Sequence, residues 1–132
     1  MRKVYIMRGV SGSGKSTKAR ELAGDIGKIH STDDYFMVDG AYKFEPRLLG
    51  RNHMRNLSAF KDSLHRSVPI VICDNTNSRH WEYKEYVEAA KNHGYEIEIV
   101  SMPHPDPVVA AKRTTHSVPE MIIRRLLARW QD

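Results

Sequence analysis

Cysteine is nearly absent from the chain, which has a single one, Cys73, among 132 residues. One cysteine excludes an internal disulfide, and this composition favours a reducing, cytoplasmic location. Cys73 lies in the apolar segment VPIVICD, so we expect a small buried core residue rather than a reactive thiol. The seven histidines are scattered and form no cluster with the cysteine, so the sequence predicts no zinc site.

Long hydrophobic runs are also missing. No apolar segment approaches the roughly 20 residues that span a bilayer, so we expect no membrane partner. The N-terminal residues MRKVYIMRG hold too short an apolar stretch for a signal peptide, and we interpret them as a first strand. Acidic residues are in deficit, at 16 against 21 basic ones. The net charge of +5 favours anionic partners such as nucleotides or nucleic acids, although it also serves solubility.

The order of apolar and amphipathic segments predicts an α/β fold, with a parallel sheet of about four strands in a three-layer arrangement. The length fits a single domain over residues 1–132. Predicted strands cover 3–7, 27–31, 68–74 and 95–101, and predicted helices cover 15–24, 48–67, 81–94, 108–113 and 121–130. The continuous apolar run at 68–74 is typical of a central strand, whereas 95–101 alternate as an edge strand does.

Local patterns refine these elements. The predicted buried face of helix 48–67 consists of His53, Leu57, Phe60 and Leu64. Ser117 and Glu120 match a capping box for the last helix, with Pro119 in its first turn. Trp81 and Trp130 lie on predicted helices, and we expect both in the core. Residues 36–47 are predicted to be irregular, because turn-forming residues and a proline interrupt any period.

Glycine is concentrated in one short segment, GVSGSGKST, at residues 9–17. Glycine, four residues, then Gly-Lys-Ser between a predicted strand and helix is typical of a phosphate-binding loop. Bare backbone N–H groups converge on the anion there, and the helix N-terminus adds the positive end of its dipole. The candidate ATP-binding residues of this segment are Gly9, Ser11, Gly12, Ser13, Gly14, Lys15, Ser16 and Thr17.

Three side chains of this segment have predicted roles. Lys15 is expected on the β- and γ-phosphates, Ser16 on Mg²⁺, and Thr17 within reach of the α-phosphate. The segment therefore predicts ATP and Mg²⁺ as cofactors.

Acidic residues follow two of the predicted strands, at the edge where ligands gather in an open parallel sheet. Asp74 ends strand 68–74 and is predicted to hold Mg²⁺ through its water shell, with an Asx-type turn as the alternative. Asp33 and Asp34 follow strand 27–31 on the acceptor side. We expect Asp33 to act as the general base that accepts the proton of an acceptor hydroxyl, and one acid of the pair to cap a helix.

A basic segment, AAKRTTHSVP, follows the proline-rich connector. A kinase must exclude water from its site and neutralise charge on the transferred group, and a helical lid carrying arginine does both. Arg113 is the candidate lid arginine, and it also belongs to the predicted ATP site. Lys112, His116 and Arg124 are weaker alternatives.

With GVSGSGKST, STDDYF, VICDNTN and KRTTHSVP taken together, the chain resembles the polynucleotide-kinase-like family of phosphate-loop ATP-binding proteins, and among them the phage 5′-hydroxyl kinase domain. The resemblance runs nearly end to end. It implies an adenylate-kinase-like phosphate-loop fold with a helical lid at the C-terminus. It also implies catalytic roles for Lys15, Asp33 and Arg113.

The resemblance extends to the acceptor side of the site. Asp74, Thr76 and Asn77 match the strand-end motif beside the acceptor, so the acceptor-side candidates are Asp33, Asp34, Asn75, Thr76 and Asn77. The phage enzyme has an arginine just after its DDY segment that grips the 3′-phosphate of the substrate, and this chain has Phe36 at that place.

These residues support three hypotheses. The first is a kinase that moves the γ-phosphate of ATP to the 5′-hydroxyl of DNA or RNA. The second is a small-molecule kinase of the same fold. The third is a nucleotide-binding module with little transfer activity, and the presence of Asp33 argues against it because a sensor needs no base there.

Overall fold

The structure, a computed structural model, describes residues 2–114 and 116–132. In chain order the elements are β1 (Lys3–Arg8), α1 (Lys15–Ala23), β2 (Gly27–His30), the 3₁₀ turn η1 (Thr32–Phe36), β3 (Met37–Val38), β4 (Ala41–Tyr42), the 3₁₀ turn η2 (Pro46–Leu48), α2 (Leu49–His65), β5 (Ile70–Asp74), α3 (His80–Asn92), β6 (Glu96–Ser101), α4 (Pro107–Arg113) and α5 (Glu120–Ala128). In the described part of the chain, no helix is both long and apolar enough to cross a membrane.

The main sheet has the strand order β2-β5-β1-β6, and every neighbouring pair in it is parallel. The predicted central strand is confirmed as β5, in which Val71, Ile72 and Cys73 are fully buried. The predicted edge strand is confirmed as β6. Burial raises the pKa of the Cys73 thiol to about 12, so this residue is the inert core cysteine that the sequence predicts.

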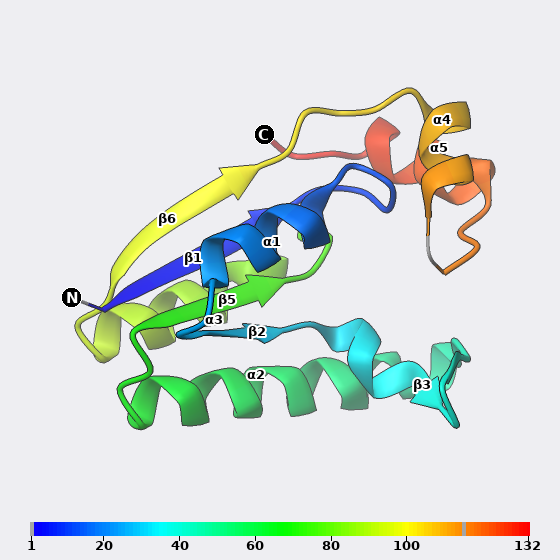
Figure 1. Ribbon diagram of the computed structural model, residues 1–132. Helices are drawn as coiled ribbons and strands as arrows, with labels where there is room; N and C mark the ends of the chain where they lie inside the picture. Colours follow the sequence, from blue (N-terminus) through cyan, green and yellow to red (C-terminus); the bar gives the residue numbers. More distant parts are fainter. Residues whose placement is uncertain (1, 115) are drawn as a thin grey trace.

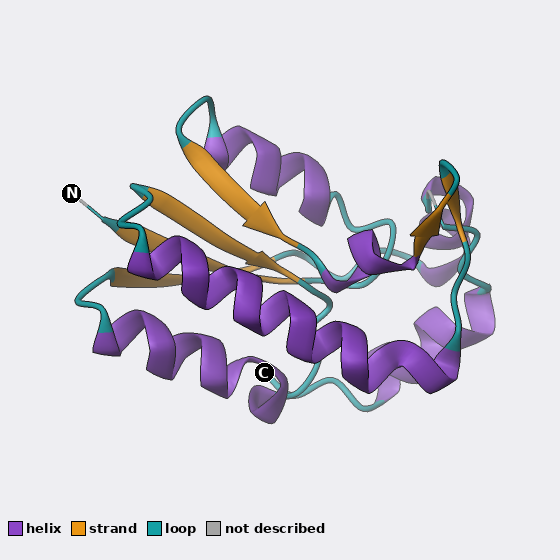
Figure 2. Ribbon diagram, turned by 90° about the horizontal axis from the view of Figure 1, so that it is seen from below, coloured by secondary structure: helices purple, strands orange, loops and turns teal. Residues whose placement is uncertain are grey.

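Helices cover both faces of the sheet, which confirms the three-layer α/β prediction (Figures 1 and 2). Helix α1 packs on one face through Ala19 and Ala23, against Met7 and Ile72. Helices α2 and α3 lie side by side on the other face. All four strands end toward the loop after β1, η1 and the α4–α5 pair (Figure 1). Residues distant in sequence therefore meet at this one edge.

The buried face of α2 differs from the predicted stripe. Phe60 and Leu64 are buried as expected, but His53 is exposed and the buried side of the first turns carries Asn52 and Asn56. Asn56 Nδ2 donates to the carbonyl oxygen of His30 at 3.3 Å and to the hydroxyl of Tyr86 at 3.0 Å. These hydrogen bonds compensate the burial of the Nδ2 end of the amide, and a search for apolar spacing misses this polar buried face.

Residues 36–47 are more ordered than predicted. Strands β3 and β4 pair as a short antiparallel hairpin. The turn between them is formed by Asp39 and Gly40, both with positive φ, at 51° and 81°. Asp-Gly is a strong signal for this kind of two-residue turn. The prediction of an irregular segment was wrong, because strands of only two residues are too short to show an alternating pattern.

The C-terminal region packs against the glycine-rich loop through a small cluster of Val10, Ala110 and Ile123. The predicted capping box of the last helix is wrong. Ser117 has a φ of 54° and lies before the N-cap, which is Pro119, a residue with no side-chain acceptor. Glu120 instead accepts a hydrogen bond from Arg124 Nε at 2.6 Å.

The two tryptophans differ in burial. Trp130 is partly buried against the C-terminal cluster, as expected. Trp81 is 74% exposed, so its predicted core position is wrong. The buried stripe of α3 runs through Tyr83, Tyr86 and Ala90, and Trp81 lies outside it.

Candidate active site

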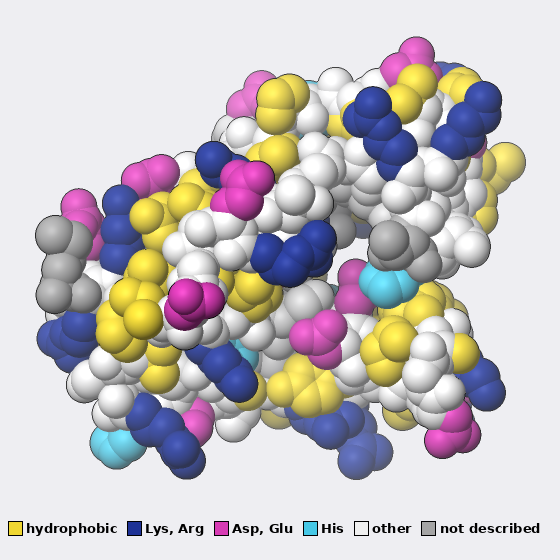
Figure 3. All heavy atoms as spheres, in the orientation of Figure 1, with side chains coloured by type: hydrophobic (Ala, Val, Ile, Leu, Met, Phe, Trp, Pro, Cys, Tyr) yellow, Lys and Arg dark blue, Asp and Glu magenta, His cyan; other side chains and the backbone are white. Residues whose placement is uncertain are grey.

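A cleft of about 490 Å³ lies at the carboxyl ends of the strands. It is bounded by the glycine-rich loop, the start of η1, the end of β5 and the segment after α4. The space-filling view shows a hollow between the lobe carrying α4 and α5 and the lobe carrying β3, with acidic and histidine side chains beside it (Figure 3). Predicted site residues that line the cleft are Ser11, Gly12, Gly14, Lys15, Ser16, Thr17, Asp33, Asp34, Asp74, Thr76 and Arg113.

The glycine-rich loop has the backbone that the sequence predicts. Gly12 and Gly14 have positive φ, at 82° and 87°, and Gly14 is the N-cap of α1. At Gly12, a Cβ would overlap the carbonyl oxygen of Ala110 and lie 2.8 Å from its Cα. Glycine at this position therefore has two functions. It leaves the backbone open to an anion, and it leaves room for α4, which packs directly on the loop.

The other two loop candidates, Gly9 and Ser13, lie next to each other within the loop. The backbone N–H of Gly9 donates to the carbonyl oxygen of Thr76 at 3.1 Å, which ties the loop to the end of β5. A Cβ at Gly9 would lie 2.5 Å from Ser13 Oγ. Neither residue is among those that line the cleft.

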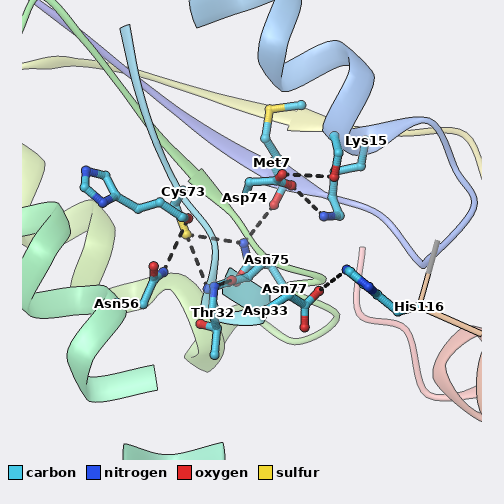
Figure 4. Close-up of polar contacts among 12 residues, drawn as sticks. Met7, Lys15, Thr32, Asp33, Asn56, Cys73, Asp74, Asn75, Asn77 and His116 are labelled. Atoms are coloured by element: carbon cyan, nitrogen blue, oxygen red, sulfur yellow. Dashed lines mark hydrogen bonds and ion pairs between the residues drawn. The ribbon is translucent and has the colours of Figure 1, made fainter. Parts of the chain in front are cut away.

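Lys15, Ser16 and Asp74 form one polar group that lines the cleft. Figure 4 shows the Lys15 and Asp74 side chains directed toward each other. Lys15 Nζ donates to Asp74 Oδ1 at 2.5 Å, and Ser16 Oγ donates to Asp74 Oδ2 at 3.1 Å. Asp74 is 5% exposed, so its charge is balanced by Lys15. A carboxylate and a hydroxyl side by side are oxygen donors of the kind that Mg²⁺ takes, and the residues present fit that ion.

Asp33 and Asp34 lie across the cleft from the loop. Asp33 Oδ1 accepts a hydrogen bond from the Tyr42 hydroxyl at 3.2 Å, and its Oδ2 is 3.9 Å from His116 Nε2. The pKa of Asp34 is raised, first by burial and then by the charges of Asp33 and Asp74. The expectation that one acid of this pair caps a helix is wrong, since the N-cap of η1 is Ser31 and no side-chain cap forms at this turn.

The asparagines after Asp74 have their side chains directed into the fold. Asn75 Oδ1 accepts from the backbone N–H of Thr32 at 2.9 Å, and Asn77 Nδ2 donates to the carbonyl oxygen of Met7 at 2.7 Å. Asn77 is 2% exposed. Of the three residues predicted here, Thr76 alone is among those lining the cleft. The two amides fix the chain between β5, β1 and η1, and so hold Asp74 and Asp33 relative to each other.

Arg113 lines the cleft from the end of α4. The segment after it is tied to the loop by a hydrogen bond of 2.5 Å between Ser11 Oγ and Thr114 Oγ1. Arg20 also lines the cleft, and sequence reasoning missed it. Its Nη2 donates to Thr17 Oγ1 at 3.3 Å, and the spacing of three residues on α1 was the signal that could have found it.

Phe36 does not take the place of a substrate-binding arginine. It is 2% exposed, with its ring centre 5.0 Å from that of Phe44 and 6.2 Å from that of Tyr42. It therefore anchors the β3–β4 hairpin, and it is not among the residues that line the cleft.

The parallel sheet, the loop and the strand-end acids define a phosphate-loop protein with a kinase-like α/β fold. The chain belongs to the AAA domain family AAA_33, whose profile matches residues 4–129. The expected membership of a phosphate-loop ATP-binding family is confirmed.

The chain is also similar to two human proteins. The chain is 38% identical over 136 residues to human NEDD4-binding protein 2, and 26% identical over 154 residues to human YLP motif-containing protein 1. Each alignment covers 97% of the chain but 8% and 7% of those proteins, so the chain spans less than a tenth of their length.

Two solved structures share the fold. A chain of the Pnkp1/Rnl/Hen1 RNA repair complex has a TM-score of 0.75 at 20% identity, over 97% of this chain and 43% of that one. A gluconokinase from Sinorhizobium meliloti has a TM-score of 0.64 at 20% identity, over all of this chain and 78% of that one. At these identities the likeness shows the fold alone.

Proposed function

We propose that the chain is an ATP-dependent phosphotransferase that moves the γ-phosphate of ATP to the 5′-hydroxyl of a nucleic acid. The observation that carries the proposal is the pairing, within one cleft, of a phosphate-binding loop and the carboxylate of Asp33 on its other side. A protein that binds a nucleotide needs the first feature, whereas a phosphotransferase to an alcohol needs both.

The loop would bind the triphosphate through its backbone N–H groups and Lys15. Lys15 is paired with Asp74, so the phosphates would compete with this carboxylate for the ammonium group. Ser16 and Asp74 would hold Mg²⁺, which would supply neutralisation of phosphate charge. Release of Lys15 from Asp74 frees the carboxylate for that role.

The transfer step uses residues on both sides of the cleft. The acceptor oxygen bonds to the γ-phosphorus, the bond from that phosphorus to the β–γ bridging oxygen breaks, and the electron pair leaves with ADP. The hydroxyl proton passes to Asp33. Arg113 and Lys15 balance the negative charge that builds on the transferred group.

A surface beside the acids supports nucleic acid as the acceptor. Tyr35 follows Asp34 directly, and the guanidinium of Arg55 lies 4.4 Å from the centre of its ring. Arg51 lies one helical turn earlier on the same side of α2, and these residues line a shallow hollow together with Met54. Arginine beside an aromatic ring fits the phosphates and bases of a single strand leaving the site.

The acceptor class is tested by offering γ-labelled ATP with either a 5′-hydroxyl oligonucleotide or a panel of small polyols and sugar acids. We expect label on the oligonucleotide, with a KM that rises with salt by roughly 0.7 log units per phosphate contact for each log unit of salt. Replacing Arg51 and Arg55 by Gln should raise the KM for the oligonucleotide and reduce this slope. Lys91→Gln, which removes one exposed charge in the last turn of α3, outside this hollow, is the control.

A small-molecule acceptor is the second candidate, and the shared fold of the gluconokinase favours it. Transfer of label to a polyol or sugar acid, with none to the oligonucleotide and no effect of the Arg51 and Arg55 substitutions, would establish that alternative.

A further inference from the structure

Asp33 is contacted from both lobes that border the cleft. Tyr42, at the end of β4, donates its hydroxyl hydrogen to Oδ1 at 3.2 Å. His116, in the segment between α4 and α5, places Nε2 3.9 Å from Oδ2, and Figure 4 shows its ring pointing toward the carboxylate. The sequence singled out His116 only as a weak alternative to Arg113, and it did not single out Tyr42.

The two rings also contact each other. The ring centres of Tyr42 and His116 are 3.9 Å apart with an interplanar angle of 22°, which is a stacked arrangement. Tyr42 is also held from the hairpin side, because its ring makes an edge contact with the buried ring of Phe36. The stack therefore joins the hairpin to the segment that carries Arg113 three residues before His116.

The contacts that Tyr42 and His116 make with Asp33 leave its Oδ2 atom available to a substrate. The pKa of the Tyr42 hydroxyl is raised, first by burial and then by the charge of Asp33, so the hydroxyl stays protonated and donates to Oδ1. The separation of 3.9 Å between Oδ2 and His116 Nε2 is too long for a hydrogen bond. It does allow a third oxygen to lie about 2.8 Å from both atoms, which is hydrogen-bonding distance.

We propose that Tyr42 and His116 are positioning residues that hold Asp33 between them, an arrangement we call the clasp. They align the free oxygen of Asp33 with the acceptor hydroxyl only when the segment carrying Arg113 lies against the hairpin. The inference rests on the proposed function. Its consequence is that the general base and the lid arginine are brought into place by one movement, which limits loss of the γ-phosphate to water.

The kinetic test uses two ring-preserving substitutions. Tyr42→Phe keeps the stack and removes the hydroxyl, and His116→Phe keeps a ring and removes Nε2. We expect each to lower kcat for label transfer about tenfold, with the KM for ATP within twofold of wild type. Tyr42→Phe loses the hydrogen bond to Asp33, and His116→Phe loses the proposed hydrogen bond between Nε2 and the acceptor oxygen. Tyr95→Phe, which removes a hydroxyl bound to the Val68 carbonyl at the far end of the sheet, should leave kcat unchanged. Unchanged kcat in both site variants would overturn the proposal.

A second measurement does not depend on activity. In the nuclear magnetic resonance spectrum of the unliganded wild-type protein, nuclear Overhauser effects should connect the ring protons of Tyr42 and His116. Equivalent effects should persist in the Tyr42→Phe variant. Their absence from wild type overturns the clasp whatever the kinetics show. If the effects are present but wild type transfers no label to any acceptor, the proposed function fails and the positioning role falls with it, while the ring contact itself stands.

Discussion

Substitution of Gly12 by alanine tests how closely the glycine-rich loop and α4 are packed. The left-handed φ of 82° costs an alanine about 1–2 kcal/mol. The added Cβ would also overlap the backbone of Ala110, and overpacking of this kind costs about 1–3 kcal/mol more. Because the obstacle is main chain rather than a flexible side chain, α4 has to move. We expect the free energy of unfolding to fall by about 2–5 kcal/mol in total.

Gly40→Ala is the matched control, because its φ of 81° is nearly the same and nothing lies within 4 Å of the added Cβ. This variant carries the backbone cost of about 1–2 kcal/mol alone. The assay is urea denaturation followed by tryptophan fluorescence in the Trp81→Phe background, so that the signal comes from Trp130, which packs on the cluster that joins α4 and α5 to the loop. If Gly12→Ala unfolds at the same urea concentration as Gly40→Ala, the close approach of α4 is refuted.

Three further predictions concern protonation and metal binding. Cys73 should stay unreactive toward a thiol reagent at pH 8 until the protein unfolds, because the thiol is buried and its pKa is about 12, and rapid labelling of the native protein contradicts this. Burial lowers the pKa of His30 to about 4. The unfolded imidazole therefore takes up a proton at higher pH than the folded one, and the free energy of unfolding should fall by up to about 3 kcal/mol from pH 6.5 to pH 4. His30→Gln should flatten this dependence in pH-dependent denaturation. Asp74→Asn should weaken Mg²⁺-dependent ADP binding roughly tenfold in calorimetry while metal-free binding persists, whereas equal loss in both conditions argues against a metal role.

Much of the fold could be predicted because its signals are local. The uninterrupted apolar run at 68–74 identified the central strand, and the alternation at 95–101 identified the edge strand. The buried face of α2 could not be predicted in this way, because Asn52 and Asn56 are polar and are buried through hydrogen-bond partners supplied by other elements. The hairpin at Asp39 and Gly40 had a turn signal but strands too short to show a period.

The site residues also differ in whether a local sequence pattern could identify them. The loop residues could be predicted from their spacing alone. Asp33 and Asp74 could be predicted to share one cleft, because both follow strands of a parallel sheet and ligands gather at the carboxyl ends of such strands. Asn75 and Asn77 were assigned to the acceptor by position in a motif, whereas their amide groups bond to the backbone of neighbouring elements. The stack of Tyr42 on His116 joins two segments far apart in the chain, so no local pattern could have indicated it.

The most direct test of the account follows the γ-phosphate of labelled ATP in the presence of a 5′-hydroxyl oligonucleotide, and counts label on the acceptor and as free phosphate separately. Wild type and Asp25→Asn, an identical chemical change at an exposed position outside the cleft, should place most of the label on the oligonucleotide. Asp33→Asn should bind ATP normally and lose transfer by roughly 100-fold or more, as expected for a missing general base. Equal transfer by Asp33→Asn and wild type would contradict the account.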